Sequence, residues 1–170
     1  MDPCPNADHP MEDLFTANAN LDEYLSIVDY QTETHEYSFR LLQDGVICSV
    51  GYLADTSVSN YIIQILDANG TILVDEEIKF ASDALEFRPI PDINIIANEE
   101  YTIRRICKDY PSDVHLAGSI LKANNVPIGT PQLSLPLTEG DLVITAVAFY
   151  GKNEEVPNAI PRIEFGFEAN

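Results

Sequence analysis

The chain has 170 residues, 45% of them hydrophobic, and its 28 acidic residues outnumber nine Lys and Arg to give a formal charge of -19. That length and apolar content are typical of one all-β domain with a single core. The negative charge repels phosphate backbones and anionic lipids, and no apolar run approaches the ~20 residues of a membrane-spanning helix. We therefore predict no nucleic-acid partner and no membrane insertion.

The N-terminal segment, residues 1–12, carries prolines and no hydrophobic periodicity, which predicts a tail ahead of a single domain over residues 13–170. It has neither the basic region nor the apolar stretch of a signal peptide. Few Lys and many Asp, Asn and Thr are nevertheless typical of secreted bacterial modules. We expect an extracytoplasmic protein, secreted or on the cell surface, whose leader is not present in this sequence; a cytosolic protein is the alternative.

Residues 21–29 allow two interpretations. Apolar side chains recur there at helical spacing behind Asn20, a good N-cap residue, with Glu23 three positions on as in a capping box. Against this, alternation through Leu25 and Ile27 and the aromatic and β-branched residues that follow favour a strand. The sequence leaves both open and slightly favours the helix.

A turn signal separates the first two clear strands. Side chains alternate in polarity over residues 37–41, and a second strand-like run covers residues 46–52. Asp44-Gly45 lies between them, and this pair is typical of a tight hairpin. We expect the two strands to pair directly.

The strongest turn signal of the chain is Asn69-Gly70, which lies between two apolar runs. Asn and Gly tolerate the positive φ that both central residues of a type I′ turn require. With a two-residue loop, two apolar pairs would face each other across this hairpin: Ile65 with Val74, and Leu66 with Leu73.

Three further strands are expected after this hairpin. Residues 85–88 alternate in polarity until Pro89 and Pro91, which restrict that strand to a sheet edge. Two more runs, residues 93–97 and 101–107, are separated by a short acidic connection. We expect them to form a meander.

The C-terminal part contains one irregular segment and two strong strand patterns. Gly, Pro and Asn throughout residues 120–137 predict an edge strand with irregular approaches. Residues 142–150, LVITAVAFY, are apolar on both faces and predict a strand in the middle of the core. The last strand has apolar residues on one face (Ile163, Phe165 and Phe167) and charged residues on the other (Arg162, Glu164 and Glu168).

Together these patterns predict an all-β fold, an antiparallel β-sandwich with at most one short N-terminal helix; a jelly roll is one such arrangement. The runs FRLLQDGVICSVGY, YIIQILDANGTIL, INIIANEEYTIRRI and ITAVAFY, within residues 37–168, resemble accessory β-sandwich domains of bacterial secreted and cell-surface proteins, including uncharacterised ones. The resemblance implies a carbohydrate-binding module or a spacer and supplies no site residue. The absence of Trp departs from many sugar-binding modules, which stack Trp on sugar rings.

The three cysteines cannot all pair within one chain. Cys4 lies in the predicted tail. A disulfide between Cys48 and Cys107 is expected only if their strands are neighbours, and the alternative is that Cys48 is a small buried hydrophobic residue.

Arg104 and Arg105 are adjacent in an expected strand, so they point to opposite faces of the sheet. We expect one of them to be a buried ion-pair partner with a structural role.

No sequence pattern indicates catalysis or a metal centre. His9, His35 and His115 are scattered without Cys or His at ligand spacing, which argues against a zinc site. There is no G-x-S-x-G elbow, and among 28 acidic residues some carboxylate pair always matches the spacing of a glycosidase. We predict that the protein is not an enzyme and has no cofactor, with structural calcium on loops as the alternative.

Residues 108–117, KDYPSDVHLA, form the best candidate for a ligand-binding loop, because they combine an aromatic ring, carboxylates and a rigidifying proline. The ring would stack on a sugar, and the carboxylates would accept hydrogen bonds from its hydroxyls. Tyrosines in two other expected loops are further candidates. The candidate ligand-binding residues are Tyr110, Asp109, Asp113, Tyr52 and Tyr150.

These observations predict a non-catalytic extracytoplasmic binding or adhesion module whose ligand is a carbohydrate and whose partner is a glycan or another surface protein. A structural or spacer domain of a surface protein, with no small-molecule ligand, is the alternative. A hydrolase acting on glycans is the third hypothesis.

Overall fold

The computed structural model describes residues 3–17, 22–28, 33–54, 60–81, 84–107, 116–123, 135–151 and 159–170. Its elements are α1 (Pro10–Ala17), β1 (Asp22–Val28), β2 (Thr34–Leu41), β3 (Gly45–Tyr52), β4 (Tyr61–Leu66), β5 (Ile72–Ile78), β6 (Glu86–Ile95), β7 (Glu100–Ile106), β8 (Leu116–Ala123), β9 (Leu137–Glu139), β10 (Leu142–Tyr150), β11 (Ala159–Pro161) and β12 (Glu164–Ala169). The predicted all-β class with one short helix is confirmed.

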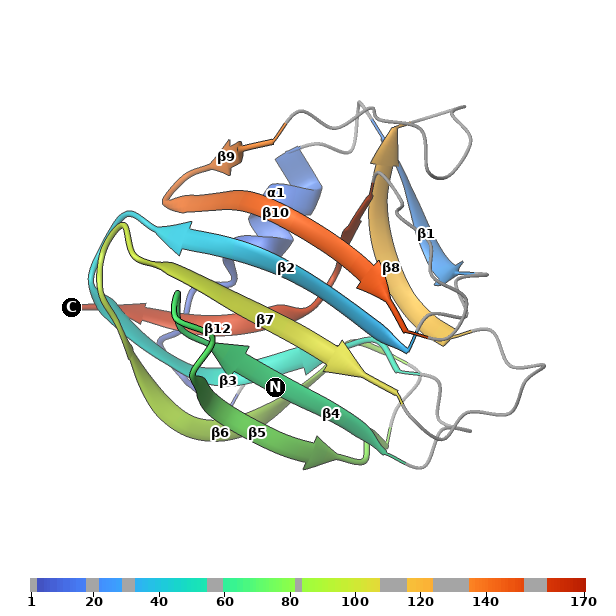
Figure 1. Cartoon of the computed structure of the whole chain (residues 1–170), viewed down its shortest axis with the longest axis horizontal. Helices are drawn as coiled ribbons and strands as arrows, with labels where there is room; N and C mark the ends of the chain where they lie inside the picture. Colours follow the sequence, from blue (N-terminus) through green and yellow to red (C-terminus); the bar gives the residue numbers. More distant parts are fainter. Residues whose placement is uncertain are drawn as a thin grey trace.

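Two packed antiparallel sheets form a β-sandwich, as predicted. The larger sheet has the strand order β5-β4-β7-β2-β10-β9, and the smaller one has the order β12-β3-β6. Figure 1 shows the larger sheet in front of the smaller one, with the short sheet β1-β8-β11 beside them. The described residues include no helix long and apolar enough to span a bilayer.

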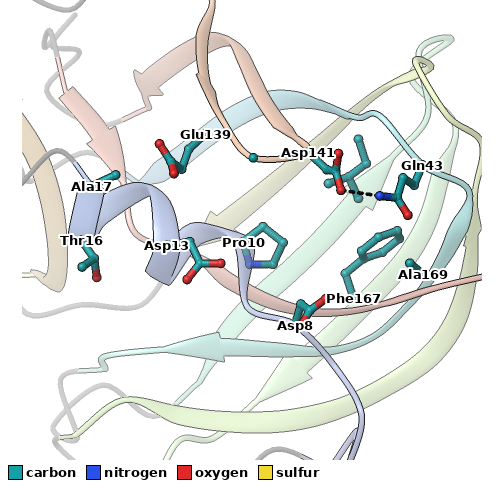
Figure 2. Close-up of a pocket in the computed structure, with 12 residues that line it drawn as sticks. Asp8, Pro10, Asp13, Thr16, Ala17, Gln43, Glu139, Asp141, Phe167 and Ala169 are labelled. Atoms are coloured by element: carbon teal, nitrogen blue, oxygen red, sulfur yellow. Dashed lines mark hydrogen bonds between the residues drawn. The ribbon is translucent and has the colours of Figure 1, made fainter.

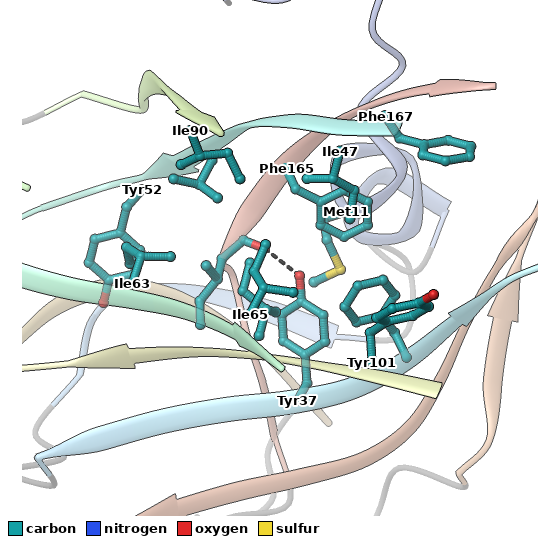
Figure 3. Close-up of a cluster of buried hydrophobic side chains, with 14 of the residues drawn as sticks. Met11, Tyr37, Ile47, Tyr52, Ile63, Ile65, Ile90, Tyr101, Phe165 and Phe167 are labelled. Atoms are coloured by element: carbon teal, nitrogen blue, oxygen red, sulfur yellow. Dashed lines mark hydrogen bonds between the residues drawn. The ribbon is translucent and has the colours of Figure 1, made fainter. Parts of the chain in front are cut away.

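The core lies between the two sheets, where alternate side chains from each sheet meet (Figure 3). Tyr37, Phe39 and Leu41 of β2 are fully buried, and Phe39 stacks on Phe165 of β12 with 5.1 Å between ring centroids. The hydroxyl of Tyr37 donates to the carbonyl of Ile163 at 2.5 Å, which satisfies the one polar atom of that buried side chain. The alternate apolar residues of β2 therefore face the core, as their spacing in the sequence predicts.

Helix α1 packs against β12, β9 and β10, and so covers the open side between the two sheets (Figure 1). It begins with Pro10, a residue favoured in the first helical position, and buries Met11, Leu14 and Phe15 at helical spacing. The helix lies partly in the segment predicted as a tail. Residues 22–28 form strand β1, so the helix interpretation of residues 21–29 is wrong and the strand alternative holds.

The segment around Asp44-Gly45 is not a hairpin, contrary to the prediction. Strand β2 belongs to the larger sheet and β3 to the smaller one, so the chain crosses from one sheet to the other here. Crowding explains the glycine, because a Cβ at Gly45 would lie 2.4 Å from the carbonyl oxygen of Glu168. Alternation identifies each strand but does not determine which sheet it joins.

The predicted meander over residues 93–97 and 101–107 is wrong for the same reason. Strand β6 lies in the smaller sheet and β7 in the larger one. The turn between them contains Asn98 with φ of 65°, whose N–H donates to the carbonyl of Leu41 at 2.8 Å. Two crossings between sheets therefore lie side by side at one end of the sandwich.

The β4–β5 hairpin is confirmed, with a different register beyond its first pair. Ile65 faces Val74 as predicted, but Leu66 faces Ile72 instead of Leu73. The strands therefore shift by one residue at a bulge beside the turn.

The turn of this hairpin is not of type I′. Positive φ occurs at Gly70, at 80°, but not at Asn69. The N–H of Gly70 donates to the carbonyl of Asp67 at 3.0 Å, which is the pattern of a type I turn followed by a glycine bulge. The Asp67 carboxylate accepts the N–H groups of Asn69 and Thr71, both at 2.9 Å. These hydrogen bonds from the backbone to the Asp67 side chain favour this turn over the two-residue type I′ turn.

Strand β6 lies at a sheet edge, as predicted, but it runs through Pro89 and Pro91, so the runs expected at residues 85–88 and 93–97 belong to one strand. The edge strand expected within residues 120–137 is not found in the described part of that range: residues 120–123 belong to β8, which lies between β1 and β11, and the edge strand β9 begins only at Leu137. Strand β10 differs from its prediction, because burial is confined to residues 142–144 and Phe149, and Ala146 is exposed. A strand with apolar residues on both faces is therefore not necessarily buried on both sides.

Strand β12 buries both of its faces. Phe165 and Phe167 face the core as predicted, but Glu164 on the other face is also fully buried. Arg162 donates to its carboxylate at 2.6 Å, although burial still raises the pKa of Glu164. Glu164 therefore lies on the charged face that the sequence predicts, but that face is buried at this position.

The disulfide joins Cys4 to Cys48, with 6.1 Å between the Cα atoms. The alternative pairing of Cys48 with Cys107 is wrong, because their strands lie in different sheets and Cys107 is a buried thiol. The covalent bond ties the N-terminal segment to β3.

Candidate functional site

Three of the predicted ligand-binding residues, Tyr110, Asp109 and Asp113, lie outside the described residues. The register nevertheless shows where the chain enters their segment. Tyr150 faces Thr34, and Thr34 faces Ile106 at the end of β7. The chain thus leaves β7 at the end of the sandwich that also holds Tyr150.

Tyr52 is not a loop aromatic, contrary to the prediction. It ends strand β3, is 2% exposed, and accepts a hydrogen bond from Nε of Arg105 at 3.1 Å. Tyr150 is half-buried at the end of β10, and its hydroxyl donates to the Glu36 carboxylate at 2.9 Å. Burial, then that hydrogen bond, raises the pKa of Tyr150 to about 12. Only Tyr150 of this pair retains exposed ring surface.

Arg104 and Arg105 lie in different environments, as expected for adjacent residues that point to opposite faces of a strand. Arg105 is fully buried between the rings of Tyr52 and Tyr61, 5.7 Å and 5.8 Å from their centroids. Its hydrogen-bond partners among the described residues are neutral, so the predicted buried ion pair is not found there. The ion pair belongs to half-buried Arg104, whose Nε lies 2.9 Å from the Glu36 carboxylate.

A hollow with a volume of about 530 Å³ lies at the opposite end of the sandwich (Figure 2). Helix α1, the β9–β10 turn and the ends of β2 and β12 surround it. We call it the acidic pocket. Its lining residues are Asp8, Pro10, Asp13, Thr16, Ala17, Leu41, Gln43, Glu139, Gly140, Asp141, Phe167 and Ala169.

The helix side of the acidic pocket follows from the amphipathic pattern of α1. With its apolar face buried in the core, the helix leaves Asp13 and Thr16 exposed beside the pocket. Asp13 lies in the first turn, where a negative charge suits the helix dipole. Just before the helix, the N–H and carbonyl of Asp8 exchange hydrogen bonds with those of Phe167, at 2.8 Å and 3.0 Å. These bonds fix the start of α1 against β12.

The opposite wall is the tight turn between β9 and β10. Glu139 faces Leu142 across a two-residue loop, and Gly140 supplies the positive φ of 54° at its first position. The carbonyl of Asp141 accepts the N–H of Leu42 at 2.9 Å, and its carboxylate accepts the side-chain amide of Gln43 at 2.6 Å. The turn is therefore anchored to the end of β2.

Four carboxylates line the acidic pocket, and no Lys or Arg is among its lining residues. They are Asp8, Asp13, Glu139 and Asp141. Like charges around one hollow create a negative potential that repels anionic ligands. At the bottom, Leu41 and Phe167 are buried, so the polar rim surrounds an apolar base.

The chemistry of this pocket is acceptance of hydrogen bonds. An ionised carboxylate offers two acceptor oxygens and no donor, and Gln43 adds one amide. In the described part of the chain, no group of three or more His, Cys, Asp and Glu side chains is placed to hold a metal ion. The pocket thus suits a ligand rich in hydroxyl or amine donors.

The sequence contained weak signals for this site. Pro10 followed by apolar residues at helical spacing indicates a helix start, and Gly140-Asp141 between apolar runs indicates a hairpin. Neither signal places the two segments side by side, because their contact depends on the packing of α1 between the sheets.

Comparison of the sequence with models of known protein families found no match, and comparison with curated proteins found none either.

Proposed function

We propose that the protein is a non-catalytic binding or adhesion module that acts outside the cytoplasm and takes a glycan in the acidic pocket. The observation that carries this proposal is the combination of a concave hollow of about 530 Å³, four acceptor carboxylates and an apolar base. Binding pockets for small ligands commonly combine apolar walls with a few polar groups that fix orientation. The pocket has a size and composition of this kind.

A sugar presents two kinds of surface that match the pocket. Its hydroxyl groups donate hydrogen bonds, and bonds to ionised acceptors such as Asp13 and Glu139 are stronger than neutral ones. Its C–H faces suit the apolar base around Phe167. Because the carboxylates repel negative charge, the preferred ligand is a neutral or amino sugar and not an acidic one.

The disulfide supports the proposed compartment. Disulfides form and persist in oxidising environments and are rare in the cytosol. The bond between Cys4 and Cys48 joins the N-terminal segment to β3, and the same segment pairs with β12 at Asp8, so an oxidising compartment would hold this segment on the sandwich.

A glycan array with a double variant tests the proposal. Asp13→Asn with Glu139→Gln removes two pocket charges at almost constant volume, from α1 and the β9–β10 turn. The control, Asp92→Asn with Glu99→Gln, makes the same changes at exposed positions that do not line the pocket. We expect binding of neutral or amino sugars by the unmodified protein and the control, and at least a tenfold loss in the pocket variant, about 1.4 kcal/mol.

Two results would contradict the proposal. Silence of the unmodified protein across neutral, amino and acidic sugars would favour the spacer function. Equal binding by the pocket and control variants would place a glycan site elsewhere on the protein.

A further inference from the structure

Each sheet of the sandwich has two edge strands, and three of the four are protected. Strand β9 has only three residues, and β6 contains Pro89 and Pro91, which lack the N–H needed for pairing. Strand β12 is bridged by Asp8 and covered by α1. Short strands, prolines and covering elements are the usual ways to prevent edge pairing.

Strand β5 (Ile72–Ile78) is the exception. It has seven residues, contains no proline, and pairs only with β4 among the described strands (Figure 1). Its first two residues, Ile72 and Leu73, are 48% and 41% exposed. They are two of the four large hydrophobic residues exposed in the described part of the chain. An unpaired edge of this length offers backbone donors and acceptors to an added strand.

The two faces of β5 differ in burial. Val74 and Ile78 are buried on the core side, with half-buried Glu76 between them, whereas Leu73, Asp75 and Glu77 alternate on the exposed side. The carboxylates of Asp75 and Glu77 accept side-chain amides of β4 and its approach, at 3.1 Å and 2.8 Å. Neither forms an ion pair with a described residue, so their negative charges stay uncompensated there.

We propose that the edge of β5 binds an extended segment of a partner protein that carries Lys or Arg on alternate residues. The added strand would pair with the backbone of residues 72–78, its basic side chains would lie beside Asp75 and Glu77, and its apolar side chains would lie beside Val74 and Ile78. Opposite charges on neighbouring strands stabilise pairing, and like charges destabilise it. This surface is separate from the acidic pocket and does not depend on glycan binding.

Charge also excludes a second copy of this chain as the occupant. The strand carries Asp75, Glu76 and Glu77 and no basic residue. Two β5 edges paired with each other would bring six carboxylates together, with both chains at a formal charge of -19. The same acidic side chains that prevent self-association therefore select a basic partner.

A peptide of alternating Lys and Val, nine residues long and capped at both ends, is the probe. Its affinity is measured by calorimetry at low salt, and amide hydrogen exchange is followed with and without it. A peptide of the same sequence with every backbone amide methylated keeps the charge but loses the donors for strand pairing. We expect only the unmethylated peptide to bind and to slow exchange within residues 72–78.

Charge reversal tests the side chains. Asp75→Lys with Glu77→Lys is expected to weaken binding about tenfold or more, because two attractive cross-strand pairs become repulsive. The control, Asp92→Lys with Glu99→Lys, changes the net charge equally at other exposed positions. Thermal unfolding confirms that each variant is folded.

The proposal fails if the methylated peptide binds as well as the probe, if both reversals weaken binding equally, or if the probe does not bind at low salt. The first two outcomes would indicate unspecific attraction to an acidic protein. An unchanged glycan array for the β5 variant would show that the two surfaces act independently.

Discussion

Arg105 donates from Nη2 to Nδ1 of His35 at 2.6 Å, in a buried position at the end of the sandwich opposite the acidic pocket. An arginine side chain is only a donor, so Nδ1 of His35 has no proton and the imidazole is neutral with its proton on Nε2. Burial, and then the Arg105 charge, hold the pKa of His35 well below its ordinary value of 6.5. A cation and a neutral histidine therefore share this site.

This pair predicts acid sensitivity of the fold. Below the ordinary pKa of 6.5, His35 is protonated in the unfolded chain but not in the folded chain. Because the unfolded state then binds more protons, the free energy of unfolding decreases as the pH is lowered. The loss from this residue is about 1.4 kcal/mol per pH unit below that value, until the folded pKa is reached. Urea unfolding across this pH range measures it.

Two variants separate this effect from other titrations. His35→Asn keeps an acceptor near Arg105 but does not titrate, so its stability should depend less on pH than that of the unmodified protein. His9→Asn removes a histidine that is only partly buried and serves as the control. Identical pH dependence in the unmodified protein and in His35→Asn would rule out His35 as the source.

The disulfide is predicted to contribute substantially to stability. Cys4 and Cys48 are separated by 44 positions, and closing a loop of that length is worth about 4 kcal/mol in the chain-entropy description. Reduction, or Cys4→Ser, should lower the denaturation midpoint and release the N-terminal segment from β3. Dithiothreitol should not lower the midpoint of Cys4→Ser further; a second loss would show that another disulfide is present.

Gly70→Val is predicted to destabilise the protein by about 1 to 3 kcal/mol. Space is not the reason, since a Cβ at this position meets no atom within 4 Å. The cost arises because φ is 80° and a β-branched residue rarely adopts positive φ. Gly70→Asn should lose less, because Asn tolerates that conformation. Equal midpoints for the Val variant and the unmodified protein would contradict the turn described above.

Tyr110 remains a predicted ligand contact. If its ring stacks on a sugar, Tyr110→Ala should abolish a glycan-array signal and leave thermal stability unchanged. A core tyrosine would instead cost about 3 kcal/mol or more when truncated. Because its segment follows β7 at the end opposite the acidic pocket, a loss of binding by Tyr110→Ala but not by the pocket variant would assign the glycan site to that end.

Fold class and most strands were predictable because they depend on local alternation. In a strand every second side chain points to the same face, and this alternation predicted that Tyr37, Phe39 and Leu41 lie in the core. The prolines of β6 predicted that this strand lies at a sheet edge. The hairpin at Gly70 was predictable for the same reason, since a positive φ is a requirement of a few neighbouring residues.

The sheet partners of those strands depended on the tertiary structure. Asp44-Gly45 has the composition of a hairpin, yet β2 and β3 separate into different sheets because each buries its apolar face from the opposite side of one core. Cys48 could likewise not be assigned a partner before the N-terminal segment was placed beside β3.

The candidate site shows the same division. The acidic residues and their excess over Lys and Arg are evident in the sequence alone, and they already exclude anionic partners by simple repulsion. Only the fold brings Asp13 from the N-terminal helix to the same hollow as Glu139, which is more than a hundred residues away. That proximity arises from long-range burial of the apolar face of α1, which no local pattern encodes.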